Sequence, residues 1–174
     1  MKSFTRFLLS QLLVVVLLFA NVPLRYYIPV ANLTPILIVL WAWRLDSKSM
    51  AWTTFCGAVL ADFVVPDAFG TAPIIWGVLL FIARSQYTLM MAFGYPVASV
   101  ICFAISFLYI IAGRLVYMAA NGTWSWTPEL LLQIAMASLV NLFIAPVLYL
   151  ILMPAYPVQR KTQTTKPFRE HAHS

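Results

Sequence analysis

GAVLADFVVPDAFG, residues Gly57 to Gly70, places one carboxylate inside an apolar run and then interrupts that run with a proline. Asp62 has apolar or small neighbours on both sides, as in a helix that crosses a membrane. Ionisable groups inside membrane spans are rare because burying a charge in hydrocarbon is costly, so each one is a functional hypothesis by default. Pro66, Asp67 and Gly70 then predict a tight turn before the next apolar segment.

The composition of the whole chain explains this apolar setting. Of its 174 residues, 63% are hydrophobic and 9% are charged, and the mean hydropathy is +0.89. A soluble domain of this size needs far more charge to cover its surface. The chain is therefore predicted to be an integral membrane protein with a single bundle, and no period of about 20–50 residues indicates a repeat array.

Six apolar segments are predicted to be helices of a transmembrane bundle, since a membrane helix needs about 20 apolar residues. They are Phe4–Val22, Pro29–Trp43, Ser49–Val65, Ala72–Ala83, Leu89–Met118 and Pro128–Met153. The second is short, and the fourth is short enough for a re-entrant segment instead of a span. The first lacks an A-x-A-like cleavage site and is predicted to be a retained helix, not a signal peptide. The predicted fold is all-α, with a six-span membrane domain at residues 1–157 and a basic, disordered tail at 158–174.

The basic residues set the predicted orientation of the bundle. With six spans both termini lie on one side of the membrane, and nine of the eleven Lys and Arg residues fall on that side. The positive-inside rule then makes both termini cytoplasmic, whereas five spans would put Arg84 or the basic tail on the wrong side. Because these flanks carry most of the net charge of +6, no nucleic-acid partner is predicted. The tail is expected to contact anionic headgroups of the lipid bilayer.

No constellation of catalytic residues appears in the sequence. It has no G-x-S-x-G, no H-E-x-x-H and no phosphate-binding glycine loop. Asp62 and Asp67 are five residues apart across a proline, so they do not share a helical face as an acid pair would. Cys56 and Cys102 lie in apolar segments, where Cys usually acts as a small hydrophobic residue. The chain is therefore predicted to be non-enzymatic, with no cofactor and no metal.

Asp62 and Arg114 are the ionisable residues in the predicted outer half of the bundle. Each lies about 4–6 Å inside the outer end of its helix, at about 1.5 Å per residue. Two partners are open for Asp62: the Arg114 guanidinium, or the N–H groups at the start of the helix after Phe69, where a carboxylate is favoured. Arg114 either joins that ion pair or extends alone to the outer interface. Asn141 and Gln133, on the last segment, are predicted to hydrogen-bond neighbouring helices.

The central stretch NLTPILIVLWAWRLDSKSMAWTTFCGAVLADFVVPDAFGTAPIIWGVLLFIARSQ, Asn32–Gln86, resembles the rod shape-determining protein MreD family of bacteria. Pro35 stands early in the second span, and a short charged turn follows that span. Gly57 precedes Asp62 on the third span, and Gly70 opens a short helix. The third span departs from the family's usual G-L-x-x-D, because it reads V-L-A-D after Gly57 and an alanine.

The last helix is similar to that family as well. SLVNLFIAPVLYLILMP, Ser138–Pro154, carries the polar Asn141 and then Pro146. Five residues are the candidates for a structural or interaction role, either because they match the family or because they are polar residues inside a predicted span. They are Asp62, Arg114, Gly57, Gly70 and Asn141.

The resemblance implies a non-enzymatic subunit of the cell-elongation machinery in the bacterial inner membrane. It implies binding to an MreC-type periplasmic scaffold. It also implies joint action with a RodA-type glycosyltransferase, its partner transpeptidase and MreB-type filaments in directing peptidoglycan synthesis and cell shape. The implied fold is like that of the six-helix substrate-binding component of energy-coupling-factor vitamin transporters.

That transporter component is the alternative function. It requires a concave site where several polar groups converge, and its first helix is expected to carry an A-x-x-x-A pattern of small residues. The first segment here, FLLSQLLVVVLLFA, is bulky throughout. The sequence therefore favours the scaffold over the vitamin binder.

Overall fold

The computed structural model describes residues 2–27, 32–64, 70–152 and 154, and all regular structure in those ranges is helical. The helices are α1 (Lys2–Tyr27), α2 (Thr34–Arg44), α3 (Ser47–Val64), α4 (Thr71–Ser85), α5 (Tyr87–Phe93), α6 (Tyr95–Asn121) and α7 (Pro128–Leu152). The predicted tail 158–174 and the turn residues Pro66 and Asp67 lie outside the described ranges.

Three of the helices are long and apolar enough to cross a membrane: α1 over Phe4–Pro23, α6 and α7. Helices α4 and α5 are together long and apolar enough to form a fourth span, if they are counted as one helix with a bend of 53°. The chain is therefore an all-α membrane protein. The count of six spans stays a prediction, because α2 has only 11 residues and α3 does not reach the hydropathy of the longer helices.

The predicted helix Leu89–Met118 is wrong at its start, because the structure divides it at Gly94 into α5 and α6. Gly94 has φ 72° and ψ −148°, a conformation that a residue with a Cβ rarely adopts. Pro96 follows in the first turn of α6, where its missing N–H costs nothing. The G-Y-P sequence at 94–96 therefore ends one helix and begins the next.

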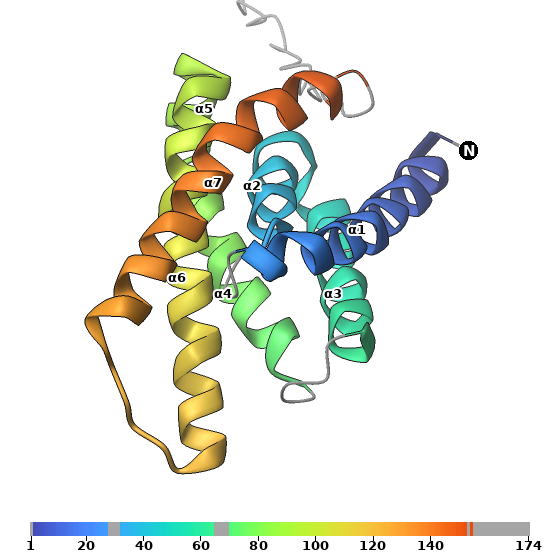
Figure 1. Ribbon diagram of the computed structural model, residues 1–174. Coiled ribbons are helices and arrows are strands. Elements are labelled where there is room, and N and C mark those ends of the chain that lie inside the picture. Colours follow the sequence, from blue (N-terminus) through green and yellow to red (C-terminus); the bar gives the residue numbers. More distant parts are fainter. Residues whose placement is uncertain (1, 28–31, 65–69, 153, 155–174) are drawn as a thin grey trace, which may run out of the picture.

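Helix α2 lies at the centre of the bundle. All ten residues from Thr34 to Trp43 are buried, and α2 packs against every other helix of the described chain. In Figure 1 it stands between α1 and α3 on one side and the long α6–α7 hairpin on the other. Its sequence, TPILIVLWAWR, is apolar on all faces until the last residue, as expected for a helix without a solvent face.

Gly57 lets α3 approach three other helices closely. A Cβ at this position would lie 3.1 Å from Val14 Cγ2 on α1, 3.2 Å from Trp41 Cη2 on α2 and 3.2 Å from Trp76 Cζ3 on α4. The rings of Trp41 and Trp76 are both fully buried, with their centroids 6.3 Å apart. Because close-packed interiors resist such shifts, even a methyl group at Gly57 would press against Val14 and these two rings.

We expect Gly57→Val to destabilise the protein through overpacking, which typically costs about 1–3 kcal/mol. Gly77→Val is the matched control, since Gly77 is also helical and has no atom within 4 Å of a Cβ added there. Both variants share the same change in helix propensity, so that term cancels. Thermal melting in detergent should show a lower midpoint for Gly57→Val alone, and equal midpoints would contradict the packing described for α3.

Candidate functional site

Asp62 joins the end of α3 to the start of α4. Its side chain is buried, with 6% exposed. The Gly70 N–H donates to Oδ2 at 2.7 Å and the Ala72 N–H donates to Oδ1 at 3.2 Å. These donors lie at the helix start, where backbone N–H groups have no partner within the helix and where the helix dipole favours negative charge. Of the two partners expected for Asp62, the structure shows the helix start.

Gly70 completes this joint. It is the N-cap residue of α4 and has φ 89°, in the left-handed region that favours glycine. Nothing lies within 4 Å of a Cβ placed there, so its backbone conformation and not crowding explains the glycine. The left-handed turn directs the N–H groups of Gly70 and Ala72 back toward the carboxylate.

An ion pair between Asp62 and Arg114 was the alternative expectation. Both residues lie in the described part of the chain, and they do not form this ion pair. Both oxygens of Asp62 already accept backbone hydrogen bonds, and α3 packs mainly against α1 and α4. Arg114 lies on α6 with its guanidinium carbon 5.1 Å from the centroid of the Tyr117 ring. Its Nε is buried without a hydrogen-bond partner.

Asn141 is the second polar centre, and it is buried in the middle of α7. Its Nδ2 donates to the Asn32 carbonyl oxygen at 2.7 Å and to Ser106 Oγ on α6 at 2.8 Å. Ser106 Oγ in turn donates to the Cys102 carbonyl oxygen at 2.7 Å. The prediction that Asn141 bonds to a neighbouring segment is therefore confirmed by these two contacts.

The contact with Asn32 places the start of α2 at the depth of the middle of α7. Two amide side chains satisfy the backbone there. Asn32 Oδ1 accepts from the Thr34 N–H at 2.9 Å and from Asn21 Nδ2 at 3.2 Å. Asn21 Oδ1 accepts from the Leu33 N–H at 2.8 Å. Because no water reaches the centre of a bilayer, a helix that begins there needs such partners from the protein itself.

Sequence reasoning did not single out Asn21 or Ser106. Asn21 had a usable signal, since an amide in the run LLFANVPL is costly in lipid unless it is bonded. Ser106 had no such signal in the sequence, because a serine in a helix can donate its hydroxyl hydrogen to the carbonyl oxygen four residues earlier, as Ser106 does. Gln133, predicted to bond like Asn141, is exposed on α7 and takes no part in this network.

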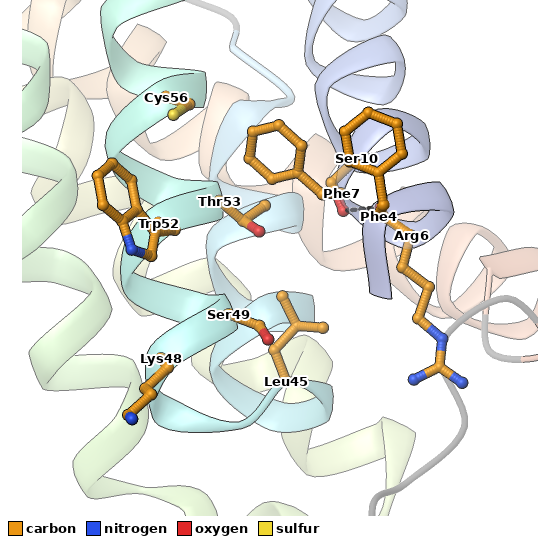
Figure 2. A pocket seen from close by; sticks show the side chains of 10 residues that line it. All are labelled: Phe4, Arg6, Phe7, Ser10, Leu45, Lys48, Ser49, Trp52, Thr53 and Cys56. Carbon is orange, nitrogen blue, oxygen red and sulfur yellow. Dashed lines mark hydrogen bonds between the residues drawn. The ribbon is translucent and has the colours of Figure 1, made fainter. Parts of the chain in front are cut away.

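A separate cavity of about 520 Å³ lies between α1 and α3. It sits at the end of the bundle where α2 ends and α3 begins, as Leu45 and Lys48 on its wall show. Figure 2 shows aromatic side chains of α1 beside it and Trp52 on the α3 side. Asp62 and Asn141 do not line this cavity.

The chain was compared with protein-family models, with curated proteins and with solved structures, and none of them matches it. The polar groups described above therefore have to be interpreted from their own geometry. They can anchor helix ends and hold helices together. Among the described residues no group of three or more His, Cys, Asp or Glu side chains is placed to hold a metal ion.

We expect Asp62→Ala to lower the melting temperature in detergent, because the N–H groups of Gly70 and Ala72 lose a buried carboxylate acceptor, and a hydrogen bond to a charged group is worth about 1.5–3 kcal/mol. Asp62→Asn keeps one acceptor oxygen and should lose less. Adding Arg114→Leu to Asp62→Ala should give additive losses, as expected for residues without a shared contact. Recovery of stability in the double variant would instead show that Asp62 and Arg114 pair.

Asn141→Leu should destabilise the protein by roughly 1–3 kcal/mol, because the Asn32 carbonyl and Ser106 then lose a buried donor. Gln133→Leu is the matched control, since it removes an exposed amide from the same helix and should stay within about 0.5 kcal/mol of wild type. Denaturation in mixed detergent micelles measures both. If the two variants unfold alike, the buried network does not stabilise the bundle.

Proposed function

We propose that this chain is an MreD-type scaffold subunit of the bacterial inner membrane, without catalytic activity of its own. In this proposal both termini are cytoplasmic and the helices make six spans, in a fold like that of the substrate-binding component of energy-coupling-factor transporters. The subunit binds an MreC-type periplasmic scaffold. It acts with a RodA-type glycosyltransferase, its transpeptidase and MreB-type filaments to direct peptidoglycan synthesis and cell shape. The resemblance of Asn32–Gln86 and Ser138–Pro154 to that family supports the proposal.

The observation that carries the proposal is how four of the buried polar side chains are used. Asp62, Asn21 and Asn32 all accept hydrogen bonds from the chain's own backbone N–H groups. Asn141 donates to the Asn32 carbonyl and to a serine of the neighbouring helix. A small-molecule binder presents such groups to its ligand, whereas a scaffold uses them to keep its helices in fixed positions. This pattern favours the scaffold.

The α6–α7 hairpin is the surface we assign to the MreC-type partner. Figure 1 shows the joined ends of these helices extending beyond the other helices, opposite the end where α2 meets α3. Aromatic side chains are exposed there, among them Tyr117, Trp124 and Trp126. With cytoplasmic termini this end faces the periplasm, where such a partner has its folded domain. Membrane helices associate by close van der Waals packing, and aromatic rings near the interface supply contact area.

The test is co-expression with the MreC-type protein followed by affinity purification in mild detergent. We expect a lasting complex, and Trp124→Ala/Trp126→Ala should weaken partner recovery about tenfold or more, since buried aromatic residues dominate interfaces. Trp52→Ala is the control, because Trp52 is as exposed as Trp124 (66% and 68%) but lies on α3. It should leave recovery unchanged.

Two results would overturn the proposal. One is the absence of the partner from the purified material at any detergent concentration that keeps the bundle folded. The other is saturable quenching of Trp fluorescence by micromolar thiamine, riboflavin or biotin, which would put the chain among vitamin-binding transporter components instead. Equal loss of partner in both tryptophan variants would leave the scaffold in place but would show that the α6–α7 hairpin is not the contact surface.

A further inference from the structure

Arg114 is a basic residue inside the apolar helix α6. It precedes the last residue of α6, Asn121, by seven positions, which places it about 10 Å along the helix from that end. Trp124 and Trp126 follow in the connection to α7, and aromatic residues of this kind lie at the membrane interface. In the proposed orientation Arg114 therefore lies in the outer part of the hydrocarbon, where an ionisable residue is costly without a partner.

The described part of the chain supplies no counter-charge to Arg114. Asp62 accepts two backbone N–H groups at the start of α4. Asp46 accepts the Ser49 N–H at the opposite end of the bundle. Glu129, in the first turn of α7, is exposed and forms no ion pair with Arg114. The counter-charge for Arg114 is therefore not among the described carboxylates.

The guanidinium of Arg114 contacts the ring of Tyr117, with its central carbon 5.1 Å from the ring centroid. Its Nε is buried without a hydrogen-bond partner. An aromatic face compensates a desolvated cation less well than a carboxylate that accepts two parallel hydrogen bonds. The Cα–Cβ bond of Arg114 also tilts toward the start of α6, away from the outer interface. A carboxylate within the hydrocarbon therefore fits Arg114 better than a lipid phosphate at the surface.

The helix face beside Arg114 is open to another helix. In this half of α6 the neighbour is α7, since the buried Ile110 clusters with Ile134 and Ala137 of that helix. Gly113 is exposed, and no atom lies within 4 Å of a Cβ placed there. Its backbone is helical, so no left-handed conformation requires the glycine. Small residues let the backbone of a second membrane helix approach closely.

We propose that a membrane helix of the MreC-type partner packs on α6 over Gly113 and places an Asp or Glu carboxylate against the Arg114 guanidinium. The inference rests on the proposed function, because this helix belongs to the partner assigned to the α6–α7 hairpin. Charge complementarity identifies the occupant, since ionisable residues within a membrane pair with one another and Arg binds a carboxylate through two parallel hydrogen bonds. Tyr117, which is 45% exposed, would be covered by the same helix.

The test measures how much co-expressed partner is recovered by affinity purification in mild detergent. Arg114→Gln should lower recovery about tenfold or more, because the partner's carboxylate would be buried without a counter-charge. Arg114→Lys keeps the charge but not the paired hydrogen bonds, and should lose less. Arg6→Gln is the matched control, since it removes one charge from a partly buried residue at the other end of the bundle. It should leave recovery unchanged.

Folding is checked on the subunit alone. Arg114→Gln should change its melting temperature in detergent little, because the described residues offer the Arg114 Nε no hydrogen-bond partner that the substitution would remove. A loss of partner recovery in this variant then reports on the contact and not on misfolding.

An exchange of charges identifies the pair. Arg114→Glu should abolish recovery, and replacing one Asp or Glu of the partner's membrane helix by Arg should restore it. Gly113→Leu should also weaken recovery, because its side chain would keep the partner's helix away. Gly77→Leu is the control and should not, since Gly77 is likewise helical, exposed and without an atom within 4 Å of an added Cβ, but has no basic neighbour in the sequence.

The other outcomes overturn the proposal. Equal recovery with Arg114→Gln and Arg6→Gln would show that Arg114 takes no part in the complex. Loss without rescue by any charge exchange, or a partner whose membrane helix carries no Asp or Glu, would exclude the acidic partner. Equal recovery with the two glycine variants would exclude packing over Gly113. Loss of a retained phosphatidylglycerol from Arg114→Gln in native mass spectrometry, with the partner still bound, would assign the guanidinium to a lipid headgroup. Absence of the partner from wild-type material would instead overturn the proposed function, so the two failures are distinguishable.

Discussion

The fold depends on one constraint: a helix that begins inside a membrane bundle must find partners for its first backbone N–H groups within the protein. Helix α2 begins at the depth of the middle of α7, and side chains of Asn21 and Asn32 accept its first N–H groups. Helix α4 begins beside the end of α3, and Asp62 accepts two N–H groups at that start. Asn21, Asn32 and Asp62 are thus placed where the backbone requires an acceptor.

The same constraint explains how α2 comes to lie at the centre of the bundle. A short helix with its start deep in hydrocarbon is stable only if protein surrounds it, and α2 is enclosed on all sides. The apolar faces of α2 then pack against large rings such as Trp76 on α4 and Tyr149 on α7. The absence of a side chain at Gly57 allows α3 to join this packing at van der Waals distance.

The buried polar side chains and the outer surfaces of the bundle have different roles. The buried side chains of Asn21, Asn32, Asp62 and Asn141 bind the chain's own backbone. The outer surfaces differ at the two ends of the bundle. The α6–α7 hairpin exposes aromatic residues such as Trp124, whereas a cavity at the opposite end is lined by aromatic residues such as Phe4 and Trp52 and by the basic residues Arg6 and Lys48.

The sequence by itself determined the all-α membrane class and the approximate helix positions, because hydropathy and chain-breaking residues act locally. It also offered the helix start as one of two partners for Asp62, and the structure shows that partner, whose donating N–H groups are only 8 and 10 residues away along the chain. The G-Y-P break at 94–96 could have been read in the same way, although a single long helix was expected. Only the tertiary structure decided that Asn141 bonds to Asn32, 109 residues earlier in the chain, and that Arg114 lies away from Asp62. The physical reason is that an all-round apolar helix such as TPILIVLWAW gives no preferred face, so its rotation and depth are set by packing against the other helices.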